Sequence, residues 1–235
     1  MRQQFAFTLV LVLFVQTTAS QEKKGTPGGV SVDMVRRAVL IDAKVAPRKL
    51  PNLDKVYPIE LVAGWGAPKG KKAHEIVVAI DGDPSDVHKG LEKLGLKPGK
   101  PAKGGPLKDG DPFPKADGPI VNVYFEVPDG AGGHRKVAVE KVLIDPATKK
   151  PPPKMTFVFT GSALTAPDPN KPDDKKYGAD LTGSLICLFP VTDEVVVQTT
   201  WTLKEEKYLK FDVNPDALPK EGSAIKLVIE VPARK

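Results

Sequence analysis

The sequence is short of the residues that build covalent or metal-based sites. Among its 235 residues there is one cysteine, Cys187, and there are three histidines. A single cysteine excludes an intrachain disulfide framework, and a structural zinc site needs several sulfur or imidazole ligands. Because Cys187 lies in the apolar run 185–189, we predict that it is a small buried residue on a strand.

Aromatic residues are scarce, and the positive charge is not clustered. Phe, Trp and Tyr make up 6% of the chain, and the net charge of +6 is spread over a sequence in which basic and acidic residues alternate. Nucleic-acid recognition requires a clustered basic face with stacking aromatic side chains. We therefore expect a solvated, lysine-rich surface and no nucleic-acid partner.

The sequence has no apolar run long enough to cross a membrane, and its N-terminus carries a short one. Residues 5–15 are apolar except for Thr8, follow Arg2, and precede a small polar stretch that ends at Ser20. This run is shorter than the roughly 20 residues that span a bilayer. The pattern is typical of a secretory signal peptide over 1–20, cleaved near Ser20, and the polar residues 21–29 are expected to form a disordered linker.

These features predict an exported protein, periplasmic or secreted, with no membrane span after cleavage of the signal peptide. Its partner would be an unknown envelope or extracellular ligand.

Proline and glycine are abundant, with 24 and 21 residues respectively. They separate short runs rich in Val, Ile, Phe and Tyr, which is typical of turns between many short strands. We predict an α+β fold with a mostly antiparallel, curved β-sheet in a single domain over 30–235. The predicted strands are 37–45, 57–64, 73–80, 119–127, 136–144, 155–160, 184–189, 194–202 and 224–231.

One short helix is predicted at about 84–94. Asp83 is a favourable N-cap and Pro84 suits the first helical position. Val87, Leu91 and Leu94 recur at helical spacing and form one apolar face. The segment that follows, 97–119, contains six prolines and five glycines, and a loop of this length inside a domain is either functional or a flexible insert.

Several segments together resemble the YdjY domain family. They are 58–63, 73–78, 84–91, 94–101, 157–162 and 177–188. Phe157 departs from the pattern, since tryptophan is more usual there, and so does the segment 191–194. The resemblance covers roughly residues 30–230 and implies an exported, planctomycete-type protein with a domain of unknown function. It brings no catalytic residues.

The most suggestive polar residues are His74 and Glu75, with Glu60 on the preceding predicted strand. A histidine with two carboxylates can bind a divalent metal or act in acid–base chemistry. Adjacent residues of a regular strand, however, point to opposite faces. The alternative is that His74 and Glu75 cap a strand and hydrogen-bond to neighbouring backbone.

Two functions remain open. The favoured one is a non-catalytic binding or interaction module that uses the sheet and the long loop. On this interpretation the protein is not an enzyme, and no cofactor is predicted. The alternative is a metal-dependent enzyme or metal-binding protein centred on Glu60, His74 and Glu75.

Overall fold

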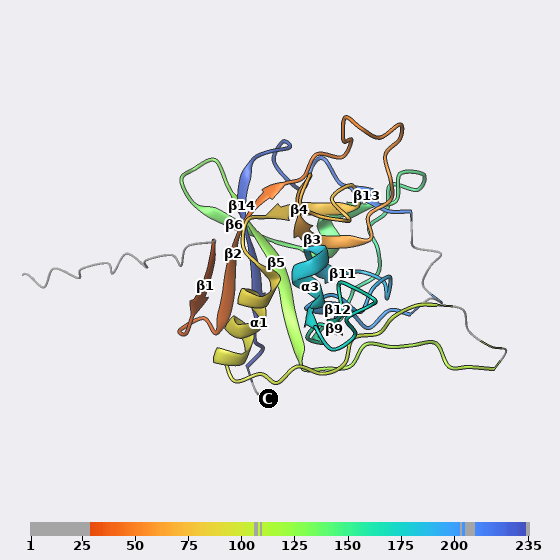
Figure 1. The fold of residues 1–235 in the computed structure, drawn as a ribbon. Helices are drawn as coiled ribbons and strands as arrows, with labels where there is room; N and C mark the ends of the chain where they lie inside the picture. The colour runs from red at the N-terminus through yellow and green to blue at the C-terminus, as the bar shows by residue number, and fades with distance from the viewer. Residues whose placement is uncertain (1–28, 106–107, 109, 203, 205–209, 234–235) are drawn as a thin grey trace, which may run out of the picture.

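The computed structural model describes residues 29–105, 108, 110–202, 204 and 210–233 (Figure 1). The predicted signal peptide and nearly all of the predicted linker lie outside these residues. The larger strands are β1 (Val30–Asp33), β2 (Ala38–Val45), β3 (Leu61–Trp65), β4 (Ile76–Ile80), β5 (Ile120–Pro128), β6 (His134–Ala138), β8 (Phe157–Phe159), β11 (Ser184–Cys187), β12 (Val197–Thr199) and β14 (Ala224–Glu230). Two-residue strands are β7 (Leu143–Ile144), β9 (Leu164–Thr165), β10 (Lys176–Tyr177) and β13 (Asp212–Val213). The helices are α1 (Pro84–Lys93), α2 (Val139–Val142) and α3 (Gly178–Thr182).

The main sheet closes on itself. Its hydrogen-bonded order is β2, β14, β5, β8, β12, β11, β3 and β4, and β4 pairs again with β2. Six of these pairings are antiparallel, whereas β3–β4 and β11–β12 are parallel. The prediction of a mostly antiparallel, β-rich fold is confirmed, but the sheet is not simply curved, because it closes into a barrel. Closure gives each of these eight strands a neighbour on both sides, whereas among the described residues β1 and β6 lie outside the closed path and pair only with β2 and β5 respectively.

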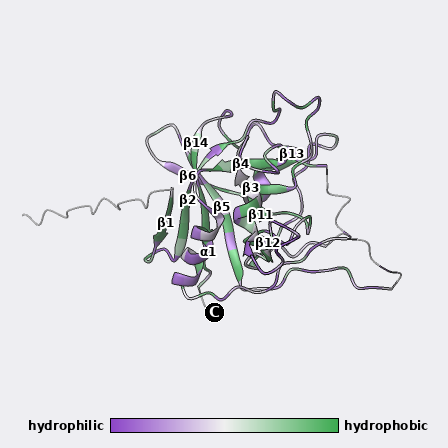
Figure 2. Cartoon of the chain, in the orientation of Figure 1, coloured by the Kyte–Doolittle hydropathy of each residue, from purple (hydrophilic) through white to green (hydrophobic). Residues whose placement is uncertain are grey.

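Apolar side chains fill the inside of the barrel. On β14, Ile225, Leu227 and Ile229 belong to the main buried cluster, while Val228 packs on the other face against Ala38. This alternation follows from the two-residue period of a strand, and Figure 2 shows the apolar strands at the centre of the molecule. An eight-stranded barrel has an interior just wide enough for side chains to fill.

Helix α1 confirms the predicted helix, and Val87 and Leu91 are buried in the main cluster. Its N-terminus differs from the prediction, because Asp83 makes no side-chain capping bond. Instead, the carboxylate of Asp180, in α3, accepts a hydrogen bond from the Ser85 N–H at 2.9 Å. Gly90 allows α1 to lie close to the barrel, since an added Cβ would come within 3.0 Å of Val39.

The strand predictions locate the main strands but miss their interruptions. A strand overlaps each of the nine predicted ranges. The predicted strand 136–144 is broken by α2, and the predicted strand 73–80 begins only at Ile76. The strands β1, β9, β10 and β13 were not predicted. Apolar, β-branched residues such as Val139 and Val142 suit a strand locally, so the turn of helix there comes from tertiary packing.

The long loop 97–119 is fastened to the barrel at its base. Lys100 and Asp117 form an antiparallel bridge across it, and Gly99 donates a backbone hydrogen bond to the Phe159 carbonyl at 3.0 Å. The loop projects sideways from the barrel in Figure 1. The base of the loop is therefore held beside β8. Within the described residues, no helix combines the length and the apolar character needed to cross a membrane.

Candidate functional site

The three predicted site residues lie at one edge of the barrel. Glu60 directly precedes β3, and His74 and Glu75 directly precede β4. Because β3 and β4 are parallel neighbours, their starting ends meet at the same edge. The Glu75 carbonyl accepts backbone hydrogen bonds from Glu60 at 3.1 Å and from Leu61 at 3.0 Å.

Lys72 completes the cluster. Its Nζ lies 2.6 Å from Glu60 Oε2 and 2.8 Å from Glu75 Oε2. On the other side of the same carboxylate, His74 Nε2 lies 3.2 Å from Glu75 Oε1. The sequence analysis did not single out Lys72, although its position three residues before Glu75 was a usable indication that the two side chains meet.

The argument that strand alternation separates His74 from Glu75 is wrong. Residues 71–75 form turns and a bend, and the strand starts only at Ile76. The alternation of side chains therefore does not apply to the pair. The His74 ring also contacts Tyr57 edge-on, with 4.9 Å between the ring centroids.

The protonation of the cluster is set by burial and by its hydrogen bonds. Burial raises the pKa of Glu60, and the hydrogen bond to Glu75 raises it further, against the opposing effect of Lys72. For Lys72, burial lowers the pKa, but the hydrogen bonds to Glu60 and Glu75 outweigh it, so the net pKa is raised. The ammonium of Lys72 therefore stays charged beside the two carboxylates.

This arrangement bears on the metal hypothesis. Glu60 and Glu75 both direct an oxygen at the Lys72 ammonium, so the chain itself supplies the positive charge between them. In the described part of the chain, no group of three or more His, Cys, Asp or Glu side chains is arranged to hold a metal ion. A divalent cation at Glu60, His74 and Glu75 would have to displace Lys72.

Cys187 lies close to this cluster but is buried in the core. It is the last residue of β11, opposite Leu61 of β3, and it is fully buried with a free thiol. Burial raises the pKa of the thiol. The prediction of a small buried residue on a strand is confirmed, and a thiol held in its neutral form is a poor nucleophile.

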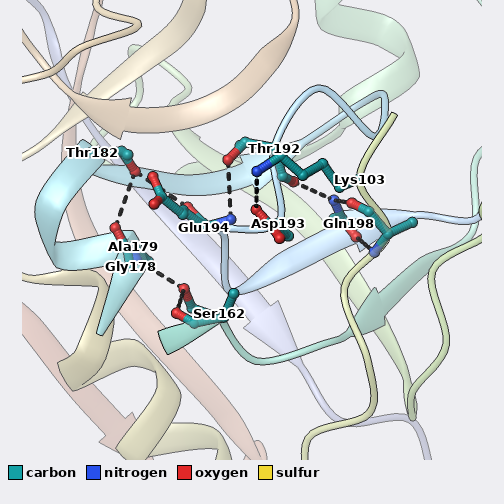
Figure 3. Close-up of polar contacts among 11 residues, drawn as sticks. Lys103, Ser162, Gly178, Ala179, Thr182, Thr192, Asp193, Glu194 and Gln198 are labelled. Carbon is teal, nitrogen blue, oxygen red and sulfur yellow. Dashed lines mark hydrogen bonds and ion pairs between the residues drawn. The ribbon is translucent and has the colours of Figure 1, made fainter. Parts of the chain in front are cut away.

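A second polar cluster surrounds His88 of α1. His88 Nδ1 lies 2.7 Å from the Tyr177 hydroxyl, and its ring meets Phe159 edge-on with 5.0 Å between centroids. Nearby, Ser162 Oγ accepts a hydrogen bond from the Ala179 N–H at 2.9 Å and donates one to the Ala163 carbonyl at 3.0 Å (Figure 3). Ser162 thus caps the start of α3, and these contacts join α1 and α3 to the barrel.

The outer face of the barrel carries two shallow hollows on either side of β6. One, of about 400 Å³, lies over β5 and β8, and the other, of about 460 Å³, lies between β6 and the segment 214–217. Both include Lys136 and Ala138. The basic side chains that line one or both are Arg135, Lys136, Lys141 and Lys154. This surface was not predicted, because Lys141 is separated from Arg135 and Lys136 by apolar residues and Glu140, and only the fold brings Lys154 to them.

Comparison with known proteins gives one family. The model of the YdjY domain matches residues 30–230. No curated protein and no solved structure matches the chain.

Proposed function

The chain belongs to the YdjY domain family, and we propose that it is a non-catalytic binding module that holds an extended, acidic segment of a partner protein along β6. The observation that carries this proposal is the position of β6. It pairs on one side only, and its residues Lys136 and Ala138 line two hollows that also carry other basic side chains.

The backbone of β6 is available for pairing. Its residues 134–138 pair with 128–124 of β5, and β5 continues on its other side to β14. Among the described residues, no strand other than β5 pairs with β6. An unpaired edge presents N–H and C=O groups that an extended peptide can bind as an added strand, with side-chain pockets providing selectivity.

The charge around β6 selects an acidic partner. Arg135, Lys136, Lys141 and Lys154 are exposed. Arg135 donates to the Ala217 carbonyl at 2.8 Å, which holds its guanidinium beside the edge. The carboxylates of Glu140 and Asp216 also line the hollows, so the basic side chains outnumber the acidic ones. Complementary charge accelerates encounter and disfavours basic partners.

The polar clusters described above support a binding role over a catalytic one. Among the described residues, every buried side-chain nitrogen and oxygen has a hydrogen-bond partner. Glu60, Glu75 and Lys72 satisfy one another, and Ser162 caps a helix. Polar groups that satisfy each other in this way stabilise the fold and hold its elements in place.

The test is fluorescence anisotropy with a labelled peptide of alternating valine and glutamate. We expect saturable binding that weakens at least about tenfold, or 1.4 kcal/mol, in Lys136→Glu/Lys141→Glu. The matched control, Lys89→Glu/Lys171→Glu, reverses two exposed lysines elsewhere and should bind as the wild type does. The same peptide N-methylated at every residue should not bind, because strand pairing needs its N–H groups. Equal binding of the N-methylated peptide, or no binding of the parent peptide, would overturn the proposal.

The convergence of Glu60, His74 and Glu75 supports a second candidate, a divalent metal site that opens when Lys72 withdraws. Thermal unfolding with added Mn²⁺ or Zn²⁺ tests it. A metal site predicts stabilisation of the wild type, about 2.7 kcal/mol at a hundredfold excess over the dissociation constant, which is lost in His74→Ala. If the metal stabilises only Lys72→Met, then in the wild type the Lys72 ammonium occupies the place between the two carboxylates. That result would exclude the metal function.

We also propose that the protein acts outside the cytoplasm. The support is the basic, apolar and small-residue pattern of 1–20, which lies outside the described residues. The fold needs no disulfide in that compartment, because the large apolar core of the barrel stabilises it.

A further inference from the structure

We infer that the turn between β1 and β2 docks the protein on an anionic lipid surface, with Met34 and Val35 inserted among the headgroups. This inference goes beyond the proposed function and uses a different surface, so either one can fail alone. Residues 34–37 are all exposed. Met34 is 57% exposed and Val35 is 94% exposed, the largest fraction among the exposed large apolar side chains of the described residues.

The turn holds these two side chains outward. The buried carboxylate of Asp33 accepts hydrogen bonds from the Val35 N–H at 3.0 Å and the Arg36 N–H at 3.1 Å. Arg37 adopts a left-handed backbone conformation with φ of 52°, which is uncommon for a residue with a side chain. A tight turn of this kind is normally built from Gly, Asn or Asp, so two adjacent apolar residues at its tip call for a function.

Both flanks of the turn are anchored to the barrel. The Arg36 guanidinium donates to the Tyr124 hydroxyl at 3.1 Å and forms an ion pair with Glu126. The Arg37 guanidinium donates to the Leu94 carbonyl at 3.3 Å, at the end of α1. The tip is therefore preorganised, and little conformational entropy is lost when it inserts.

The same end of the molecule is apolar beyond the tip. Figure 1 places the β1–β2 turn, the last turn of α1 and the end of β14 together at the lower end. A hollow of about 400 Å³ lies there, and Ile120 at its rim is 56% exposed. The hollow is lined by Arg37, Leu94, Gly95, Leu96, Ile120, Val231, Pro232 and Ala233.

Basic side chains lie at this end of the molecule, with the exposed Glu92 of α1 as an acidic neighbour. Lys93 and Lys97 are exposed on either side of the end of α1, next to Arg37. Apolar side chains at a protruding tip with a basic collar match a bilayer interface, where anionic headgroups attract Lys and Arg and the acyl boundary takes up the apolar groups. A protein partner would need a pocket that matches the convex tip, and it is an outcome that the test distinguishes.

Binding is measured by co-sedimentation with vesicles of phosphatidylcholine alone and of phosphatidylcholine with phosphatidylglycerol. We expect binding to the anionic vesicles only, and a loss of roughly tenfold or more in Val35→Asp, because insertion would have to desolvate a carboxylate. The matched control is Leu164→Asp. Leu164 is 63% exposed but lies on β9, in another part of the structure, so this variant should bind as the wild type does.

Insertion itself is read by fluorescence. Because the native Cys187 is buried, Val35→Cys can be labelled selectively with an environment-sensitive fluorophore, with Leu164→Cys as the control. We expect a blue shift with anionic vesicles at position 35 and none at position 164. Equal binding of Val35→Asp and wild type to the anionic vesicles would overturn the inference and would indicate a purely electrostatic attachment. The absence of a blue shift at position 35 would also overturn it. Retained binding of the valine–glutamate peptide by Val35→Asp would show that the β6 surface is intact.

Discussion

The side-chain amide of Gln198 pairs with the backbone of Ala102 as a neighbouring strand would. The Ala102 N–H donates to Gln198 Oε1 at 2.8 Å, and Gln198 Nε2 donates back to the Ala102 carbonyl at 2.9 Å (Figure 3). The same Nε2 donates to the Thr192 carbonyl at 2.8 Å. Gln198 is buried in β12 and thus fastens two loops to the barrel wall: the base of 97–119 and the connection from β11 to β12.

Gln198→Ala should destabilise the protein by about 2–4 kcal/mol, because it removes these hydrogen bonds and leaves buried backbone groups unpaired. Urea denaturation measures the loss. Limited proteolysis should also cut within 97–119 faster than in the wild type. Asn122→Ala is the control, since Asn122 is exposed and its side chain donates only to Glu230. An unchanged cleavage rate in Gln198→Ala would show that the loop is held by other contacts.

Glu60→Gln should change how stability depends on pH. The pKa of Glu60 is raised from its ordinary value of 4.5, so the folded state holds this proton more tightly than the unfolded state does. Its contribution is therefore present below pH 4.5 and is lost as the pH rises through the folded pKa. We expect the wild type to lose stability relative to Glu60→Gln as the pH rises from 4.5 toward neutrality. Urea denaturation across this range gives the difference, and a difference independent of pH would contradict the pKa assignment.

Cys187 should react slowly with a thiol reagent in native buffer and fast in denaturant, because it is buried and its pKa is raised. Absorbance during labelling gives both rates. Val35→Cys serves as the exposed reference and should react fast in native buffer. Cys187→Ser should cost about 1–3 kcal/mol, the desolvation of a hydroxyl without a good partner. Fast native labelling of wild type would mean that β11 opens readily.

The mature protein recovered from its host should begin at or near Gln21. The physical basis is the short apolar run 5–15 with a basic residue before it and small residues after it. Mass spectrometry of the N-terminal peptide measures the start directly. Recovery of the chain with Met1 from the cytoplasm would contradict both the predicted cleavage and the proposed location.

Much of the local structure could be predicted from the sequence. Pro84, Val87 and Leu91 define α1, because a helix must place its apolar residues at a spacing near 3.6. The alternating residues of 120–128 and 224–230 define β5 and β14 for the corresponding reason in strands. The family pattern and the burial of Cys187 also followed from the sequence. Each of these depends on neighbours along the chain.

Other features were decided by tertiary structure alone. A two-residue period tells which face of a strand is buried but not which strand lies beside it, so the pairing of β4 with β2 that closes the barrel was not predictable. Asp180 caps α1 in place of Asp83, and Gln198 takes the place of a strand beside Ala102. Lys72 lies between Glu60 and Glu75 because parallel strands bring separate segments to one edge. The contacts of Asp180 and Gln198 and the pairing of β4 with β2 join residues that are not neighbours along the chain, so only the folded barrel fixes their distances.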